Sequence, residues 1–204
     1  MSANRQSVSD HSNGYEAIAA EFIALRGAPA ETRPAVGVLT VREWARTLRP
    51  GGAVLDLGCG PGYPITQLLV DAGLAVHGVD ASPNMVAAFR ARFPGVPVEC
   101  NDVARSNFFG REFDGIVAWG LLFLLRPGAQ AQLLDKVGHA LTRDGRFLFT
   151  APRQLCEWSD SMTGRQSVSL GAEGYRRLLE AAGMELIDET EDEGENHYYL
   201  AARR

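Results

Sequence analysis

A strand that turns sharply into a helix is the feature that most constrains this chain. Residues 54–57 (Val-Leu-Asp-Leu) are apolar apart from one carboxylate, and Gly58, Gly60 and Gly62 follow at alternate positions. A short apolar run that ends in glycines indicates a buried strand and a tight turn. Glycine lets the backbone approach a ligand closely, and the helix after the turn offers unpaired N–H groups at its positive end.

A second apolar stretch ends in Asp80, eighteen residues after Gly62. A carboxylate at the tip of the neighbouring strand is well placed to accept hydrogen bonds from ribose hydroxyls. We therefore expect an adenosine-containing ligand at the carboxyl edge of a parallel sheet.

The glycine spacing decides which ligand class fits. A dinucleotide fingerprint needs glycines at relative positions 1, 3 and 6, and here the third of these positions is Tyr63. A phosphate-binding P-loop needs Gly-Lys-Ser/Thr, but the only lysine in the chain is Lys136. Both patterns are therefore disfavoured.

The remaining pattern, Asp56-x-Gly58-x-Gly60-x-Gly62, resembles motif I of the class I S-adenosylmethionine-dependent methyltransferases at all four positions. The resemblance extends over most of the chain, because later landmarks follow in the family's order. It implies S-adenosyl-L-methionine as the cofactor and S-adenosyl-L-homocysteine as the product, with no metal. The implied reaction is in-line transfer of a methyl group to an oxygen, nitrogen or carbon atom of a small molecule.

Alternating strand and helix patterns predict an α/β fold with crossover connections. We expect strands at 53–57, 75–79, 96–99, 114–119 and 145–150, and helices at 63–72, 82–92, 128–142 and 172–182. Residues 184–190 and 196–202 are strand-like and separated by a short charged turn, so they must form an antiparallel hairpin. The predicted fold is Rossmann-like and doubly wound: a mostly parallel seven-stranded sheet that ends in an antiparallel hairpin, with extra N-terminal helices.

The polar residues 1–12 are predicted to be a disordered tail, followed by a single domain over 13–204. Within it, residues 13–49 form an N-terminal helical cap, with apolar side chains at helical spacing on either side of Pro29 and Pro34. Residues 151–171 are a long polar connection, which we expect to be a lid on the substrate side.

The composition of the chain disfavours several classes of binding partner. A net charge of −5 without any basic run disfavours a nucleic-acid footprint. The three cysteines are too few for a disulfide framework, and no zinc spacing is present. Neither a signal peptide nor an apolar run long enough to span a membrane is found. We expect a cytoplasmic monomer or homodimer that binds a small molecule and no membrane.

The resemblance also implies roles for the acidic residues. Asp56 would lie beneath the methionine part of the cofactor, and Asp80 would bind the ribose, although Asp80 is also placed to cap the next helix. Asp102 would reach the adenine amino group with Val103 lining the base, although Asn-Asp is common in surface turns. Met85 would pack on the adenine or fill the core. The other implied cofactor contacts are Tyr15, Gly58, Cys59, Gly60, Gly62, Ala81 and Trp119. Cys59 lies at a helix N-terminus but has no recognisable base nearby, so a nucleophilic role is disfavoured.

The acceptor side is less specific. Candidate substrate contacts are Phe22, Arg153, Trp158 and Tyr198. His197 is the best candidate for a general base, although a half-buried strand histidine with satisfied hydrogen bonds explains it equally well. The remaining histidines, at positions 11, 77 and 139, are expected to have no partners.

Three rival functions remain. The first is an RNA or protein methyltransferase that works with a partner. The second is a non-catalytic cofactor-binding scaffold on the same fold, and the third, which the Tyr63 position disfavours, is a nicotinamide oxidoreductase.

Overall fold

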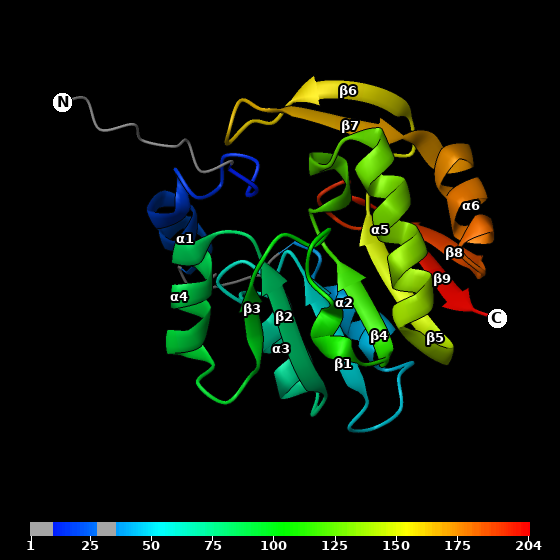
Figure 1. Ribbon diagram of the computed structural model, residues 1–204, viewed down its shortest axis with the longest axis horizontal. Coiled ribbons are helices and arrows are strands. Elements are labelled where there is room, and N and C mark those ends of the chain that lie inside the picture. Colours follow the sequence, from blue (N-terminus) through cyan, green and yellow to red (C-terminus); the bar gives the residue numbers. More distant parts are fainter. Residues whose placement is uncertain (1–9, 28–35) are drawn as a thin grey trace.

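Seven strands form one sheet in the order β3-β2-β1-β4-β5-β9-β8 in the computed structural model, which describes residues 10–27 and 36–204 (Figure 1). β1 to β5 run parallel, and β9 inserts antiparallel between β5 and β8. The predicted fold class, including the terminal hairpin, is confirmed. The strands are β1 (Ala53–Leu57), β2 (Ala75–Asp80), β3 (Val98–Cys100), β4 (Phe113–Ala118), β5 (Leu141–Thr150), β8 (Met184–Glu191) and β9 (His197–Arg203).

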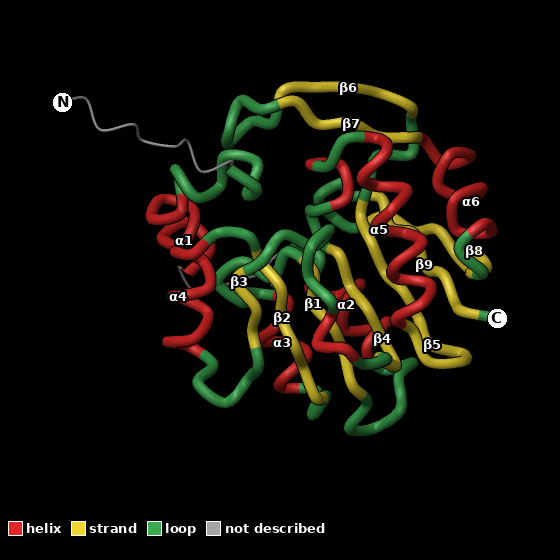
Figure 2. The backbone as a smooth tube through the Cα atoms, in the orientation of Figure 1, coloured by secondary structure: helices red, strands yellow, loops and turns green. Residues whose placement is uncertain are grey.

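Helices cover both faces of the sheet (Figure 2). Side chains of successive strand residues point to opposite faces, so Val54 packs with α2 and α3, whereas its neighbour Leu55 packs with α5 and α6. The helices in the described residues are α1 (Ala19–Gly27), α2 (Val38–Ala45), α3 (Ile65–Asp71), α4 (Pro83–Arg92), α5 (Pro127–Ala140) and α6 (Gly171–Ala181). None of them is long and apolar enough to cross a membrane.

The start of the first helix differs from the prediction. Asn13 and Gly14 have φ values of 52° and 90°, which no right-handed helix contains. Residues 11–18 therefore form turns, and regular helix begins only at Ala19. This irregular segment is what brings the residues before α1 over the sheet edge.

Residues 151–171, which we expected to be a lid on the substrate side, contain a two-stranded hairpin, β6 (Leu155–Ser159) and β7 (Gln166–Leu170). In Figure 1 this hairpin lies beyond the carboxyl ends of the parallel strands. A hairpin has its own backbone hydrogen bonds, so this segment is held as a rigid unit rather than as a loose loop.

The predicted tail lies largely outside the described residues, as do Pro29 and Pro34. Its last part, Asp10 to Ser12, is described and forms a hydrogen-bonded turn. The Asp10 carboxylate accepts from the N–H groups of Ser12 and Gly14, at 3.0 and 2.9 Å. These three residues therefore belong structurally with the segment that precedes α1.

Candidate functional site

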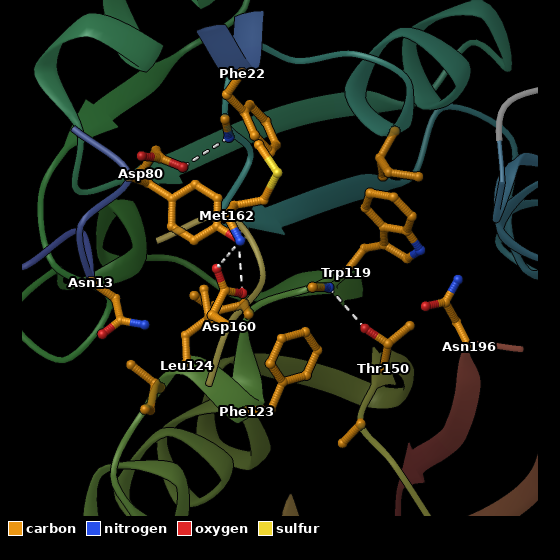
Figure 3. A pocket seen from close by; sticks show the side chains of 18 of the residues that line it. Asn13, Phe22, Asp80, Trp119, Phe123, Leu124, Thr150, Asp160, Met162 and Asn196 are labelled. Atoms are coloured by element: carbon orange, nitrogen blue, oxygen red, sulfur yellow. Dashed lines mark hydrogen bonds between the residues drawn. The ribbon is translucent and has the colours of Figure 1, made fainter. Parts of the chain in front are cut away.

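A cavity of about 1200 Å³ opens at the carboxyl ends of the parallel strands (Figure 3). Its walls come from the segment around α1, the loops after β1 to β5, the β6–β7 hairpin and the β8–β9 turn. Most of the predicted site residues line it: Tyr15, Phe22, Asp56, Gly58, Cys59, Gly60, Asp80, Ala81, Met85, Asp102, Val103, Trp119, Arg153, Trp158 and His197. Gly62 and Tyr198 do not.

Three carboxylates follow neighbouring strands across this edge. Asp56 lies in β1, Asp80 ends β2 and Asp102 follows β3, in the same order as the strands in the sheet. One Asp102 oxygen accepts the Ala104 N–H, as in the surface turn we considered. The other lies 3.1 Å from His11 Nδ1, at the cavity wall. The prediction that His11 has no partner is therefore wrong.

Asp80 is bonded to the backbone on both sides. Its Oδ2 accepts the Gly60 N–H at 2.8 Å, and its Oδ1 accepts the Ser82 N–H at 2.8 Å. Burial raises the pKa of Asp80, and these two hydrogen bonds oppose that rise. The cap of α4 is instead the Ser82 side chain, which accepts from the N–H of Met85. Each Asp80 oxygen keeps a lone pair that a ribose hydroxyl can use.

Asp56 is buried and accepts one side-chain hydrogen bond, from the Thr66 hydroxyl at 2.6 Å. Burial raises the pKa of its carboxyl from 3.8 to about 7, although the Thr66 hydrogen bond lowers it. A buried carboxylate of this kind is costly to ionise without a cation beside it. Because Asp56 lines the cavity, a ligand ammonium group is a suitable partner.

The three motif glycines have different roles, although all have positive φ. Gly58 and Gly60 line the cavity, and the nearest atom to an added Cβ at Gly60 would be Phe22 Cε1, at 4.0 Å. An added Cβ at Gly62 would lie 2.4 Å from Phe93 Cε2. The prediction of Gly62 as a ligand contact is corrected: this glycine is needed because α4 packs against it.

Trp119, after β4, is held in place from the terminal hairpin. Its indole Nε1 donates to the Tyr198 hydroxyl at 2.8 Å, which in turn donates to Asp192 Oδ2 at 2.7 Å. Tyr198 is fully buried, so it positions Trp119 instead of touching a substrate. Asp192 accepts further hydrogen bonds from Asn196 and Gly194, which fix the chain of contacts at its outer end.

Comparison with known proteins agrees with this geometry. A family model described as a methyltransferase domain matches residues 54–145, which contain the glycine loop and all three carboxylates. Over this segment the chain resembles S-adenosylmethionine-dependent methyltransferases. It is 45% identical, over 85 residues, to trans-aconitate 2-methyltransferase of Methylobacterium nodulans, a match covering 41% of this chain and 31% of that protein.

Solved structures of methyltransferases share the fold. CcbJ from Streptomyces caelestis superposes with a TM-score of 0.75 at 16% identity, covering 96% of this chain and 98% of CcbJ. Magnesium protoporphyrin IX methyltransferase of Synechocystis PCC 6803, with bound S-adenosylhomocysteine, has a TM-score of 0.67 at 19% identity, covering 82% and 81% of the two chains. CalS10 of Micromonospora echinaspora, a neighbour with a TM-score of 0.65 at 18% identity, was solved with S-adenosylmethionine bound. The chain spans 31% to 54% of the length of four curated relatives that it matches.

The methyltransferase fold places His197 at the cavity wall with both ring nitrogens occupied. Nε2 lies 3.0 Å from Glu189 Oε2, and Nδ1 lies 3.4 Å from Glu191 Oε1. Glu189 also pairs with Arg153, at 3.6 Å. A general base needs a nitrogen that is free to take a proton from the acceptor. The structure therefore favours the alternative, a strand histidine with satisfied hydrogen bonds.

Two other histidines that we expected to be without partners also have them. His77 packs edge-on against Phe113 and its Nε2 lies 3.4 Å from Arg111 Nη1. His139 Nδ1 lies 2.9 Å from the carbonyl oxygen of Asp135. Neither histidine lines the cavity.

The segment before α1 and the β6–β7 hairpin meet across the cavity. The Tyr15 hydroxyl donates to Asp160 Oδ2 at 3.3 Å, and Arg165 Nη2 pairs with Asp10 Oδ2 at 3.2 Å. Asp160 Oδ1 is held in the hairpin turn by the N–H groups of Met162 and Thr163. We call this set of contacts the clasp. Figure 3 shows Asp160 and Trp119 facing the same space.

Sequence reasoning missed several cavity residues, most of them outside the matched motif. The alternation in residues 155–159 and 166–170, with a Gly-containing turn between them, is a hairpin signal that could have located Asp160. Nothing in the sequence marked the tertiary positions of the others. Residues without an assigned role that line the cavity include Asn13, Arg26, Phe123, Thr150, Met162, Glu191 and Asn196.

Proposed function

We propose that this chain transfers a methyl group from S-adenosylmethionine to a small-molecule acceptor with an oxygen, nitrogen or carbon nucleophile. The observation that carries the proposal is the row of carboxylates and the glycine loop opening into a single cavity. Its volume of about 1200 Å³ exceeds the roughly 300–1,000 Å³ of a common small-molecule pocket. Such a space can hold a cofactor and a small acceptor together.

In this proposal the cofactor lies along the strand ends. Asp102 accepts a hydrogen bond from the adenine amino group, and Val103 and Met85 pack beside the base. Asp80 accepts hydrogen bonds from the ribose hydroxyls, and Asp56 pairs with the methionine ammonium group. All five residues line the cavity. A hydrogen bond to an ionised carboxylate contributes about 1.5–3 kcal/mol, so Asp80 is expected to dominate nucleoside recognition.

The acceptor would lie on the other side of the cavity, beneath the clasp. Its walls there are largely aromatic, with Trp119 after β4 and Phe123 packed on Trp158 of β6 at 5.4 Å between ring centroids. Methyl transfer from a sulfonium needs an acceptor held in line and water excluded. Aromatic faces also favour a sulfonium cation. Because the cofactor carries its own activated leaving group, the displacement itself requires few catalytic side chains.

The region matched by the family model ends at residue 145, before β6, β7, β8 and β9. The β6–β7 hairpin supplies Asp160 and Arg165 to the clasp and Trp158 to the aromatic wall. Acceptor choice in this chain is therefore expected to depend on residues 151–204 together with Trp119 and Phe123 of the matched region.

Calorimetric titration with S-adenosylmethionine, S-adenosylhomocysteine and NAD tests the cofactor. Mass-spectrometric detection of methylated product with panels of small amines, alcohols, phenols and carboxylic acids then tests the reaction. Binding of the two sulfur nucleosides with methylation of a small acceptor is the expected result. Methylation of only RNA or protein would favour the first rival function, and nucleoside binding without any methylation would favour a scaffold. Binding of NAD alone would overturn the proposal.

A further inference from the structure

Arg26 is a cation in the cavity wall without a counter-charge among the described residues. Its guanidinium lies 4.6 Å from the ring centroid of Trp119 and 5.4 Å from that of Phe22. The structure records no hydrogen bond or ion pair between Arg26 and another described residue. Burial lowers the pKa of Arg26, and the charge of the nearby Tyr15 acts in the opposite direction. A partly buried charge that the protein does not compensate is costly, so a bound anion would stabilise it.

The other cations of the cavity already have acidic partners. His11 lies 3.1 Å from Asp102, and Arg153 and His197 both face Glu189, at 3.6 and 3.0 Å. Arg26 is therefore distinguished, within the described part of the cavity wall, by a charge that remains available to a ligand.

The position of Arg26 indicates which part of a ligand it meets. Phe22, one turn earlier in α1, faces Gly60, since its Cε1 would lie 4.0 Å from a Cβ added there, and Trp119 follows β4. Arg26 thus lies over the ends of β1 and β4, whereas Asp80 and Asp102 follow β2 and β3. A nucleoside lying along the strand ends, as in the proposed function on which this inference rests, directs its amino-acid end towards Arg26.

We propose that Arg26 binds the α-carboxylate of the cofactor's methionine. A guanidinium presents paired N–H groups that match the two oxygens of a carboxylate. The two charges of the amino-acid end then meet opposite charges of the protein, the ammonium at Asp56 and the carboxylate at Arg26. No bond is made or broken in this step.

The Trp119 ring positions the guanidinium of Arg26. An arginine held over an aromatic ring loses less freedom on binding than a free one, because the cation–π contact already restricts the guanidinium. That ring is in turn fixed through the Tyr198 hydroxyl and Asp192. The terminal hairpin therefore contributes to cofactor binding without touching the cofactor, and the site is complete only when α1 lies over Trp119.

The experiment compares two ligands that differ in the amino-acid end. S-adenosylhomocysteine carries the carboxylate, whereas 5′-methylthioadenosine carries the same nucleoside without it. Calorimetric titrations use the wild type, Arg26→Gln, Arg26→Lys and the matched control Arg92→Gln. Arg92 also stacks on an aromatic ring, Tyr63 at 5.3 Å, but does not line the cavity.

We expect Arg26→Gln to weaken S-adenosylhomocysteine binding by about tenfold or more and to leave 5′-methylthioadenosine within about twofold of the wild type. Arg26→Lys should fall between the two, and Arg92→Gln should match the wild type for both ligands. Unchanged S-adenosylhomocysteine affinity in Arg26→Gln would overturn the assignment, as would an equal loss for both nucleosides. If the wild type binds neither nucleoside, the proposed function fails, and this inference fails with it.

Discussion

Asp80 Oδ2 accepts a hydrogen bond from the Gly60 N–H, with 2.8 Å between oxygen and nitrogen. The side chain that ends β2 therefore also fixes the glycine loop that follows β1. A second backbone N–H, that of Ser82, meets the other oxygen. The group expected to bind ribose is therefore also a structural support for the loop beside it. Substitutions at Asp80 must be interpreted with both roles in mind.

Asp80→Asn should weaken S-adenosylhomocysteine binding by about tenfold or more, because the amide loses both the charge and one acceptor. Asp80→Ala should also lower the free energy of unfolding, since each orphaned buried N–H costs about 1–3 kcal/mol. Calorimetry and urea unfolding measure the two effects.

The matched control for Asp80 is Asp114→Asn. Asp114 accepts from the Ala53 N–H at 2.7 Å and from Arg49 Nε at 2.6 Å, and it does not line the cavity. This variant should lose stability and keep its affinity. An Asp80→Asn protein that binds as tightly as the wild type would remove Asp80 from the ribose site.

Two glycines of the loop allow a role in cofactor binding to be compared with a role in packing. Gly62→Ala should destabilise the fold by about 1–3 kcal/mol or more, because its Cβ would meet Phe93 at 2.4 Å and its φ is +82°. Gly60→Ala has no such clash, so it should cost about 1–2 kcal/mol for the left-handed backbone and mainly reduce nucleoside affinity. Thermal unfolding and titration of both variants check this. Equal behaviour of the two would show that we have assigned their roles wrongly.

Asp56 should make stability and binding depend on pH in opposite directions. Its pKa is raised from 3.8 to about 7 by burial, so the folded state keeps a proton that the unfolded state has lost. The contribution of Asp56 to the free energy of unfolding is therefore fully present below about pH 4, and it falls as the pH rises through about 7. A ligand ammonium prefers the ionised carboxylate, so affinity should rise over the same range and then level off.

Urea unfolding and calorimetric titration between about pH 5 and 8, with Asp56→Asn as the reference, measure both trends. The variant should lack the part of each slope that belongs to Asp56 and should bind the nucleoside more weakly at high pH. Identical pH profiles in the two proteins would contradict a raised pKa at this position.

Tyr198→Phe should loosen Trp119 without adding or removing an atom in the cavity. Loss of the hydroxyl leaves the indole N–H and Asp192 without their partner, at a cost of about 1–3 kcal/mol. We expect weaker S-adenosylhomocysteine binding as well, through Arg26. The control is Tyr175→Phe, a buried tyrosine that donates to Gln130 at 2.8 Å and does not line the cavity. A similar stability loss in both variants, with an affinity loss only in Tyr198→Phe, is the expected pattern.

Local sequence patterns were sufficient to predict the strands of the parallel sheet and the helices between them. The apolar run at 53–57 coincides with β1, and Ser82-Pro83 marks the start of α4 where Ser82 caps it. Such signals depend on residues close together in the chain, which is why they can be read from it. Residues 151–171 were harder, because their strands are short and half exposed and no continuous apolar run marks them.

The sequence by itself indicated the resemblance to methyltransferases, the cofactor class and the row of carboxylates, because motif spacing and strand order place these residues at one sheet edge. Only the tertiary structure showed which candidates line the cavity. In the structure Tyr198 is fully buried and Gly62 packs closely against Phe93, so neither lines the cavity. Both ring nitrogens of His197 have glutamate partners. The tertiary structure also brought Arg26 onto Trp119, 93 positions later in the chain. Contacts between distant segments depend on how the elements pack, and no local pattern encodes them.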